Sequence, residues 1–130
     1  MTRVLVTGAG GFIGSHLAEL LVERGFAVRA LVHYNARGHW GWLEDSAYKA
    51  DLEVMAGDVR DFDAVLRAVR GCDVVFHLAA LIGIPYSYES PLAYIRTNVE
   101  GTYNILEAVR SLNVGQVLVT STSETYGTAQ

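Results

Sequence analysis

The sequence predicts an α/β fold in which a doubly wound parallel sheet carries helices on both faces. Short, mostly apolar runs alternate with segments whose apolar residues recur at helical spacing, and a glycine-rich turn directly follows the first run. Apolar runs without a polar face are typical of strands buried on both sides, and strands that alternate with helices form parallel sheets through right-handed crossovers. We expect five strands in the order 3-2-1-4-5, within one domain over residues 1–130.

Each predicted strand is a short apolar run that ends at glycine or at polar residues. The runs are residues 3–7, 26–32, 52–56, 73–78 and 116–121. The ligand crevice of a doubly wound sheet lies at the carboxyl ends of its strands, where the strand order reverses. We therefore expect a binding site beside the first strand.

Three segments between the first four strands are candidates for helices. The first begins at Phe12, and Gly25 stands where glycine commonly ends a helix. Residues 61–70 carry their apolar side chains on one helical face. Residues 39–50 predict only a short helix, because they are rich in aromatic residues but weakly periodic.

The longest predicted helix precedes the fifth strand. It starts near Ser90 and Pro91, because serine caps helices and proline suits the first turn, and it ends at about Leu112. Its apolar stripe consists of Ile95, Val99, Thr102, Leu106 and Val109. Such a stripe can pack on the sheet of its own chain or on a second copy.

Composition and charge exclude several classes of function. The 130 residues are 51% hydrophobic and 18% charged, which is typical of a compact folded domain. No apolar run reaches the ~20 residues of a membrane-spanning helix. Ten Lys and Arg residues are scattered and the formal net charge is −4, so we expect no nucleic-acid partner. One cysteine, with no Cys/His pair at zinc-ligand spacing, argues against a metal site, and we expect a cytoplasmic protein.

The glycine-rich turn indicates a dinucleotide site. Between the first strand and the first helix the chain reads Gly-Ala-Gly-Gly-Phe-Ile-Gly. Gly8 allows a sharp turn, Gly11 lets the backbone approach a pyrophosphate, and Gly14 lets the helix pack closely on the sheet. The helix N-terminus at Phe12 and Ile13 supplies amide donors and partial positive charge. The spacing is not the commonest GxGxxG, and such a turn can serve packing alone, but its strand–turn–helix context predicts a Rossmann fold.

The end of the second strand carries the residues that would choose between NAD and NADP. An acidic side chain there would hydrogen-bond the ribose and repel a 2′-phosphate, but this chain has none. His33 and Arg37 could face a phosphate, which favours NADP. In the alternative, His33 is a loop residue and Asn35 hydrogen-bonds the ribose of NAD.

Asp58 and Val59 leave the third strand beside the expected adenine position. There the Asp58 carboxylate could accept a hydrogen bond from the adenine amino group. Alternatively, Asp58 only ends the strand and caps the following helix.

The chain resembles the extended short-chain dehydrogenases/reductases of the NAD-dependent epimerase/dehydratase type. Four motifs carry the resemblance, at residues 7–14, 57–61, 77–80 and 98–108. The resemblance implies that Leu78, Ala79 and Ala80 line the ribose and nicotinamide side of the cofactor. It also implies that Asn98, counted among the cofactor-site residues, supports the active site from behind.

The end of the fifth strand resembles nucleotide-sugar 4,6-dehydratases. Residues 121–127 read Ser-Thr-Ser-Glu-Thr-Tyr-Gly, and related epimerases usually have a small apolar residue in place of Glu124. The resemblance implies hydride transfer from the sugar C4, loss of the C5 proton with water from C6, and return of the hydride. Thr122 would hydrogen-bond the C4 oxygen and Ser123 would approach the C6 hydroxyl. Glu124 would be the C5 base, with a pKa raised by partial burial.

Other interpretations of this segment remain open. Its hydroxyls could satisfy backbone groups at a strand end. Tyr126 has no lysine four residues on and is expected to serve packing. The protein could also be a nucleotide-sugar 4-epimerase, or a dinucleotide-binding module that is not an enzyme.

The resemblance further implies a longer enzyme. The family's Tyr-x-x-x-Lys pair, its last strands and its substrate domain are not among these 130 residues, so we expect the N-terminal part of a lyase, inactive by itself. The expected substrate is a nucleotide-diphosphate sugar, of the GDP- or UDP-N-acetylglucosamine or GDP-mannose type, met by the loop at residues 81–90. The long helix implies a homodimer.

Overall fold

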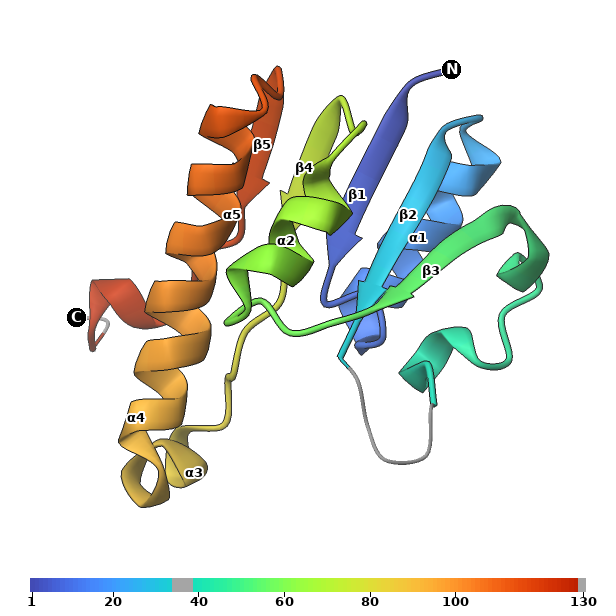
Figure 1. Cartoon of the computed structure of the whole chain (residues 1–130). Helices are drawn as coiled ribbons and strands as arrows, with labels where there is room; N and C mark the ends of the chain where they lie inside the picture. The colour runs from blue at the N-terminus through green and yellow to red at the C-terminus, as the bar shows by residue number, and fades with distance from the viewer. Residues whose placement is uncertain (34–38, 129–130) are drawn as a thin grey trace.

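The computed structural model describes residues 1–33 and 39–128. Five parallel strands form one sheet in the order β3-β2-β1-β4-β5, which confirms the predicted fold class and strand order. The strands are β1 (Arg3–Thr7), β2 (Ala27–Val32), β3 (Leu52–Ala56), β4 (Val74–His77) and β5 (Gln116–Val119). All five carboxyl ends meet at one edge of the sheet (Figure 1).

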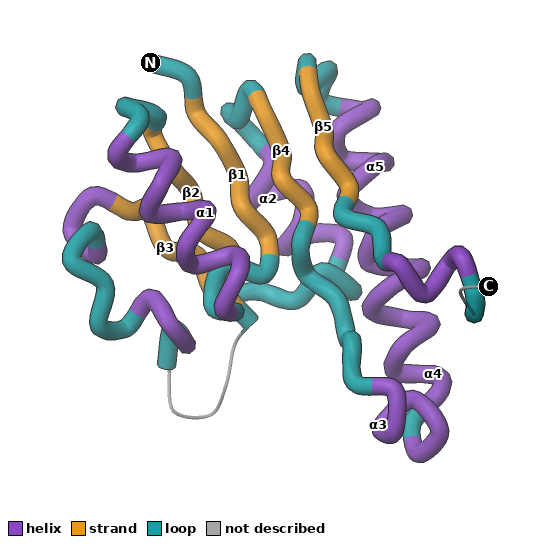
Figure 2. The backbone as a smooth tube through the Cα atoms, turned by 180° about the vertical axis from the view of Figure 1, so that it is seen from behind, coloured by secondary structure: helices purple, strands orange, loops and turns teal. Residues whose placement is uncertain are grey.

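Helices cover both faces of the sheet (Figures 1 and 2). One face carries α1 (Phe12–Glu23), and the other carries α2 (Phe62–Val69) and α5 (Gly101–Ser111). Successive side chains of a strand point to opposite faces. Val4 and Val6 accordingly join the core on the α1 face, whereas Leu5 joins the core with α2 and α5.

Residues 39–50 do not form the short α-helix that we expected. The described part of the segment between β2 and β3 contains two single 3₁₀ turns, Gly41–Leu43 and Lys49–Asp51. Leu43 is fully buried in the α1-side core. A longer helix would need buried side chains at helical spacing, and around Leu43 the chain does not repeat them.

The long helix forms with an irregular middle. Pro91–Tyr94 (α4) leads into a π-helical segment, Ile95–Glu100, and then into α5. The expected serine cap is wrong, because the Ser90 side chain makes no cap hydrogen bond. A short helix, α3 (Ile84–Glu89), also occupies most of the loop that we expected at residues 81–90.

The π-helical segment changes which side chains of the long helix are buried. A π turn adds a residue to the repeat and so rotates the helix on one side of it relative to the other. Ile95 and Val99 are 55% and 64% exposed, and Leu106 is 43% exposed. The buried residues of α5 are Gly101, Asn104, Ile105 and Ala108. Three of the five residues of the predicted stripe, Ile95, Val99 and Leu106, are therefore not buried against the sheet of their own chain.

Strand β5 forms an open edge of the sheet. Its four residues are all exposed, including Leu118 at 50%. On the face that α1 covers, none of the described helices lies over β5 (Figure 2). Within the described residues, no helix combines the length and the apolar character that crossing a membrane requires.

Candidate cofactor-binding site

The candidate site lies at the carboxyl ends of β1 and β4, the two neighbouring strands at which the strand order reverses. From β1 the chain enters α1 on one face, and from β4 it passes to α3, α4 and α5 at the other side (Figures 1 and 2). Open α/β sheets bind ligands in the crevice between crossovers that diverge in this way.

Gly8, Gly11 and Gly14, three of the four glycines of the turn, have different surroundings. Gly8 has a φ of +68°, and a Cβ on it would lie 2.8 Å from the Ala79 backbone nitrogen. A Cβ on Gly14 would lie 2.1 Å from the Gly8 carbonyl oxygen. Among residues 1–33 and 39–128, the only atom within 4 Å of a Cβ on Gly11 is the Gly8 oxygen, at 3.4 Å, and Gly11 is exposed. A side chain at Gly8 or Gly14 would collide with the backbone, whereas the space at Gly11 is open to a ligand.

The N-terminus of α1 is suited to an anion. Gly11 is its N-cap residue and offers no side-chain cap, and the first turn contains no acidic residue. Phe12 and Ile13 are 60% and 70% exposed. Amides at such a helix end have no intrahelical partners and carry the positive end of the helix dipole. The open cradle at Gly11 and these amides fit a diphosphate.

A buried hydrogen-bond network fixes the backbone that faces this turn. The Thr7 hydroxyl oxygen accepts from the backbone N–H groups of Leu78 and Ala79, both at 3.0 Å. It must therefore donate its own proton to His77 Nδ1, 2.8 Å away. His77 then carries its proton on Nε2 and donates it to the Thr102 hydroxyl at 3.0 Å. Burial lowers the pKa of His77 to about 4, which keeps the ring neutral.

Asn98 holds the backbone of Leu81, two residues after Ala79. Its Oδ1 accepts from the Leu81 N–H at 2.8 Å, and its Nδ2 donates to the Leu81 carbonyl at 2.9 Å. Asn98 belongs to the π-helical segment, and π turns are frequent at functional sites. These two bonds fix the backbone at Leu81, and the supporting role that the resemblance implies for Asn98 stays a prediction.

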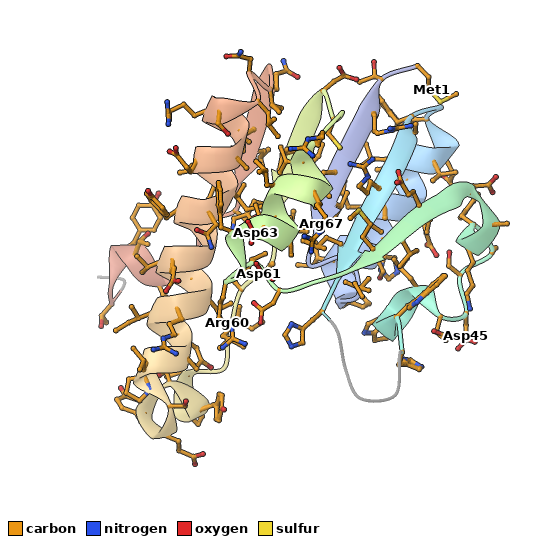
Figure 3. The ribbon with its side chains drawn as sticks, in the orientation of Figure 1. Met1, Asp45, Arg60, Asp61, Asp63 and Arg67 are labelled. Atoms are coloured by element: carbon orange, nitrogen blue, oxygen red, sulfur yellow. The ribbon has the colours of Figure 1, made fainter. Side chains whose placement is uncertain are left out.

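Asp58 and Val59 lie on the turn between β3 and α2. Arg60 hydrogen-bonds the Asp58 carboxylate at 2.5 Å and holds the pKa of that carboxyl below its usual range. The alternative that Asp58 caps α2 is wrong, because Asp61 caps it by accepting from the N–H groups of residues 63 and 64. Figure 3 shows Arg60 and Asp61 between the start of α2 and the long helix.

The turn between β3 and α2 borders a pocket and is tied to α5 by a hydrogen bond. A pocket of about 360 Å³ is lined by Asp58, Arg60, Asp61, Arg96 and Glu100. Val59 is buried, and its carbonyl accepts from Asn104 Nδ2 at 2.9 Å. Asn104 lies in the fourth motif but is not among the site residues expected from the sequence.

The residues expected to choose the cofactor are only partly described. His33 follows β2 and is exposed. Asn35 and Arg37 lie outside the described residues.

The expected catalytic residues follow β5, at the open edge of the sheet. Thr122, Ser123 and Glu124 are all exposed, so the partial burial expected of Glu124 is wrong for this chain. Thr122 Oγ1 accepts from the Glu124 N–H at 3.2 Å and so caps the 3₁₀ turn Ser123–Tyr126, as the backbone-satisfying alternative anticipated. Tyr126 is 88% exposed, contrary to the packing role expected of it. These side chains are exposed because they follow β5, which forms an open edge of the sheet.

Comparisons with known proteins identify the family. The family described as GDP-mannose 4,6 dehydratase matches residues 5–130. The chain is 38% identical over 125 residues to a UDP-N-acetyl-alpha-D-glucosaminuronate decarboxylase of Bacillus cytotoxicus, covering 96% of the chain and 38% of that protein. It is 34% identical over 134 residues to UDP-glucuronate 4-epimerase 4 of Arabidopsis thaliana, covering 95% of the chain and 30% of that protein.

A solved structure is similar as well. MoeE5 in complex with UDP-glucuronic acid and NAD has a TM-score of 0.82 and 35% identity, covering 98% of the chain and 39% of MoeE5. The chain thus spans less than two fifths of the length of each of these three proteins. With the fold, the glycine-rich turn and these matches together, the chain belongs to the NAD-dependent epimerase/dehydratase family of extended short-chain dehydrogenases/reductases.

Proposed function

We propose that the chain binds a nicotinamide dinucleotide and forms the cofactor-binding part of a longer enzyme that acts on nucleotide-diphosphate sugars. One observation carries the proposal: the turn is closed by backbone at Gly8 and Gly14, but open at Gly11 beside an uncapped helix N-terminus. Packing alone would not require this open position. MoeE5, which has the same fold, is a complex with NAD and a UDP-sugar.

Different residues of the candidate site would contact different parts of the cofactor. The amides of Phe12 and Ile13 would hold the diphosphate, and Gly11, whose own N–H donates to the Gly8 carbonyl, would let it approach the backbone. Asp58 and Val59 would face the adenine. Leu78, Ala79 and Ala80 would line the nicotinamide side, on backbone that the Thr7 hydroxyl and Asn98 keep in place. A nicotinamide bound there supplies reversible hydride transfer.

For the form of the cofactor, the proposal follows the sequence and favours NADP through His33 and Arg37. His33 is exposed at the end of β2. MoeE5 binds NAD, so the two cofactors need a direct comparison. Calorimetric titration with NADH and NADPH tests this choice. Arg37→Ala should weaken NADPH more than NADH, and equal effects on both would exclude a 2′-phosphate contact.

For the reaction we propose nucleotide-sugar 4,6-dehydration. Thr122 would hydrogen-bond the sugar C4 oxygen, Glu124 would accept the C5 proton, and Ser123 would lie near the departing C6 hydroxyl. All three are exposed at the open edge of β5. We propose that further polypeptide of the complete enzyme covers this edge and encloses them, which would raise the pKa of a carboxyl base toward its working range.

The reaction is tested by Glu124→Gln in the complete enzyme. The variant should keep dinucleotide binding and lose the 4-keto-6-deoxy product, because an amide cannot accept the proton. Glu124→Asp, which retains a carboxylate, should keep part of the activity. Unchanged turnover in Glu124→Gln would remove this residue from the mechanism.

A 4-epimerase is the second candidate, because the chain is also similar to a UDP-glucuronate 4-epimerase. Epimerisation at C4 needs the same hydride transfer but no base at C5. Product analysis separates the two candidates, since an epimerase returns a sugar of unchanged mass whereas a dehydratase product is lighter by one water.

We also propose a homodimer through the long helix. Five large apolar side chains lie exposed on it at helical spacing: Leu92, Ile95, Val99, Tyr103 and Leu106. Exposed apolar stripes of this kind mark association surfaces. A second copy would cover the stripe with its own equivalent helix.

A further inference from the structure

The segment between β2 and β3 contacts the tip of the glycine-rich turn through backbone atoms. The Trp42 N–H donates to the Gly10 carbonyl at 2.9 Å. Gly41 has a φ of +62°, and a Cβ on it would lie 2.2 Å from the same oxygen. A Cβ on Gly10 would lie 3.2 Å from the Trp40 carbonyl oxygen. Glycine at both positions permits this close approach, and we refer to Trp40, Gly41 and Trp42 as the brace.

The brace has its own anchors in the protein. Leu43, the next residue, is fully buried in the core. The Glu44 carboxylate accepts from the Trp40 N–H at 3.1 Å and pairs with Lys49 at 3.0 Å. The Lys49 ammonium also lies 4.6 Å from the centre of the Trp40 ring. The backbone of the brace is therefore held without any contribution from a ligand.

Two further hydrogen bonds tie the same segment to the body of α1. The Ser46 hydroxyl donates to Glu19 at 2.7 Å, and the Tyr48 hydroxyl donates to Glu23 at 2.7 Å. The brace thus joins the tip of the turn to the helix that follows it. The brace contacts the turn at Gly10, whereas the backbone that follows β4 contacts it at Gly8.

The brace also contacts the first residue of α1. The Trp42 ring packs edge-on against Phe12, with ring centres 5.2 Å apart. Both side chains are about 60% exposed, so burial in the core does not account for this contact. Gly10 and Phe12 flank Gly11, the open position of the turn. The brace therefore touches the residues on both sides of the proposed diphosphate position.

We propose that the brace is a positioning element for the cofactor's diphosphate. It holds the peptide groups around Gly11 in the orientation that presents their amides to the phosphates. Fixing the backbone of one flexible residue costs about tenfold in an equilibrium constant, and a turn that is already held avoids this cost on binding. The inference rests on the proposed dinucleotide binding and adds the residues that prepare the turn for it.

The test compares two glycines of positive φ. Gly41→Ala places a Cβ against the Gly10 oxygen, whereas Gly25→Ala, at a φ of +87°, meets no atom of the described residues within 4 Å. Both variants carry the strain of a left-handed alanine, but only Gly41→Ala displaces the turn. In calorimetry, Gly41→Ala should weaken NADH and ADP about tenfold and leave adenosine, which lacks phosphates, unchanged. Gly25→Ala should bind all three as the wild type does.

A second variant keeps the test decisive if Gly41→Ala does not fold. Trp42→Ala removes an exposed ring and its contact with Phe12, and should weaken NADH several-fold, whereas Trp42→Phe should bind almost normally. NADH affinity unchanged in Gly41→Ala and Trp42→Ala, or equally weakened by Gly25→Ala, would overturn the brace alone. A wild-type chain that binds no dinucleotide would overturn the proposed function and the brace with it.

Discussion

His77 couples the stability of the site to pH. Its ring is 3% exposed, accepts from Thr7 and donates to Thr102, and burial lowers its pKa from 6.5 to about 4. Protonation would place a second proton on Nδ1 and break the hydrogen bond from Thr7. Between pH 6.5 and about 4 the unfolded chain therefore binds more protons than the folded chain, and stability falls as the pH falls.

The size of the effect follows from the two pKa values. Each pH unit within this window costs about 1.4 kcal/mol, so the full window is worth about 3 kcal/mol. Most carboxylates titrate below pH 5, and between pH 6.5 and 5 the histidine alone should remove about 2 kcal/mol. This contribution is fully present above pH 6.5 and is lost progressively as the pH falls toward 4.

Urea unfolding at several pH values measures this effect against His77→Asn. The asparagine amide oxygen can accept from Thr7 but does not titrate in this range. The other three histidines are present in both proteins, so their contributions cancel. The free energy of unfolding should fall by about 2 kcal/mol more in the wild type than in the variant from pH 6.5 to 5. Equal pH dependence in the two proteins would refute the buried neutral histidine.

Two other side chains give separate predictions. Asn104→Ala leaves the buried Val59 carbonyl without its partner and should cost about 1–3 kcal/mol in urea unfolding, whereas the exposed Ser111→Ala should cost little; equal costs would contradict this role. Val99→Asp places a charge in the exposed stripe of the long helix and should convert a dimer into a monomer in sedimentation, whereas Arg110→Gln on the same helix should not. A dimer that persists in Val99→Asp would exclude this surface.

The sheet could be predicted because its signals are local. Each strand is an apolar run that glycine or polar residues interrupt, and Arg3–Thr7 and Leu52–Ala56 begin and end where the sequence indicated. Rules of crossover handedness then leave few possible strand orders. The open position at Gly11 follows from the same local pattern.

Other features depend on contacts that no local pattern contains. The π-helical segment includes the Asn98 clamp on Leu81, 17 residues away, so its change of phase cannot be inferred from helical spacing. The brace contacts Gly10 through backbone atoms alone, and a Trp-Gly-Trp sequence does not indicate where its peptide groups bind. Glu124 is exposed at the open edge of β5, and a pattern within one strand does not indicate what its edge contacts.

Calorimetric titration of NADH into Gly11→Val, with Gly115→Val as the control, tests the central claim most directly. A side chain meets no crowding at either glycine, since the nearest atoms lie 3.4 and 3.8 Å from the Cβ, but only Gly11 faces the proposed diphosphate. Losing two charge-assisted amide contacts, worth about 3 kcal/mol, should weaken NADH about 100-fold. Gly115→Val should bind normally. A folded Gly11→Val that binds NADH as tightly as the wild type would contradict a diphosphate site at this turn.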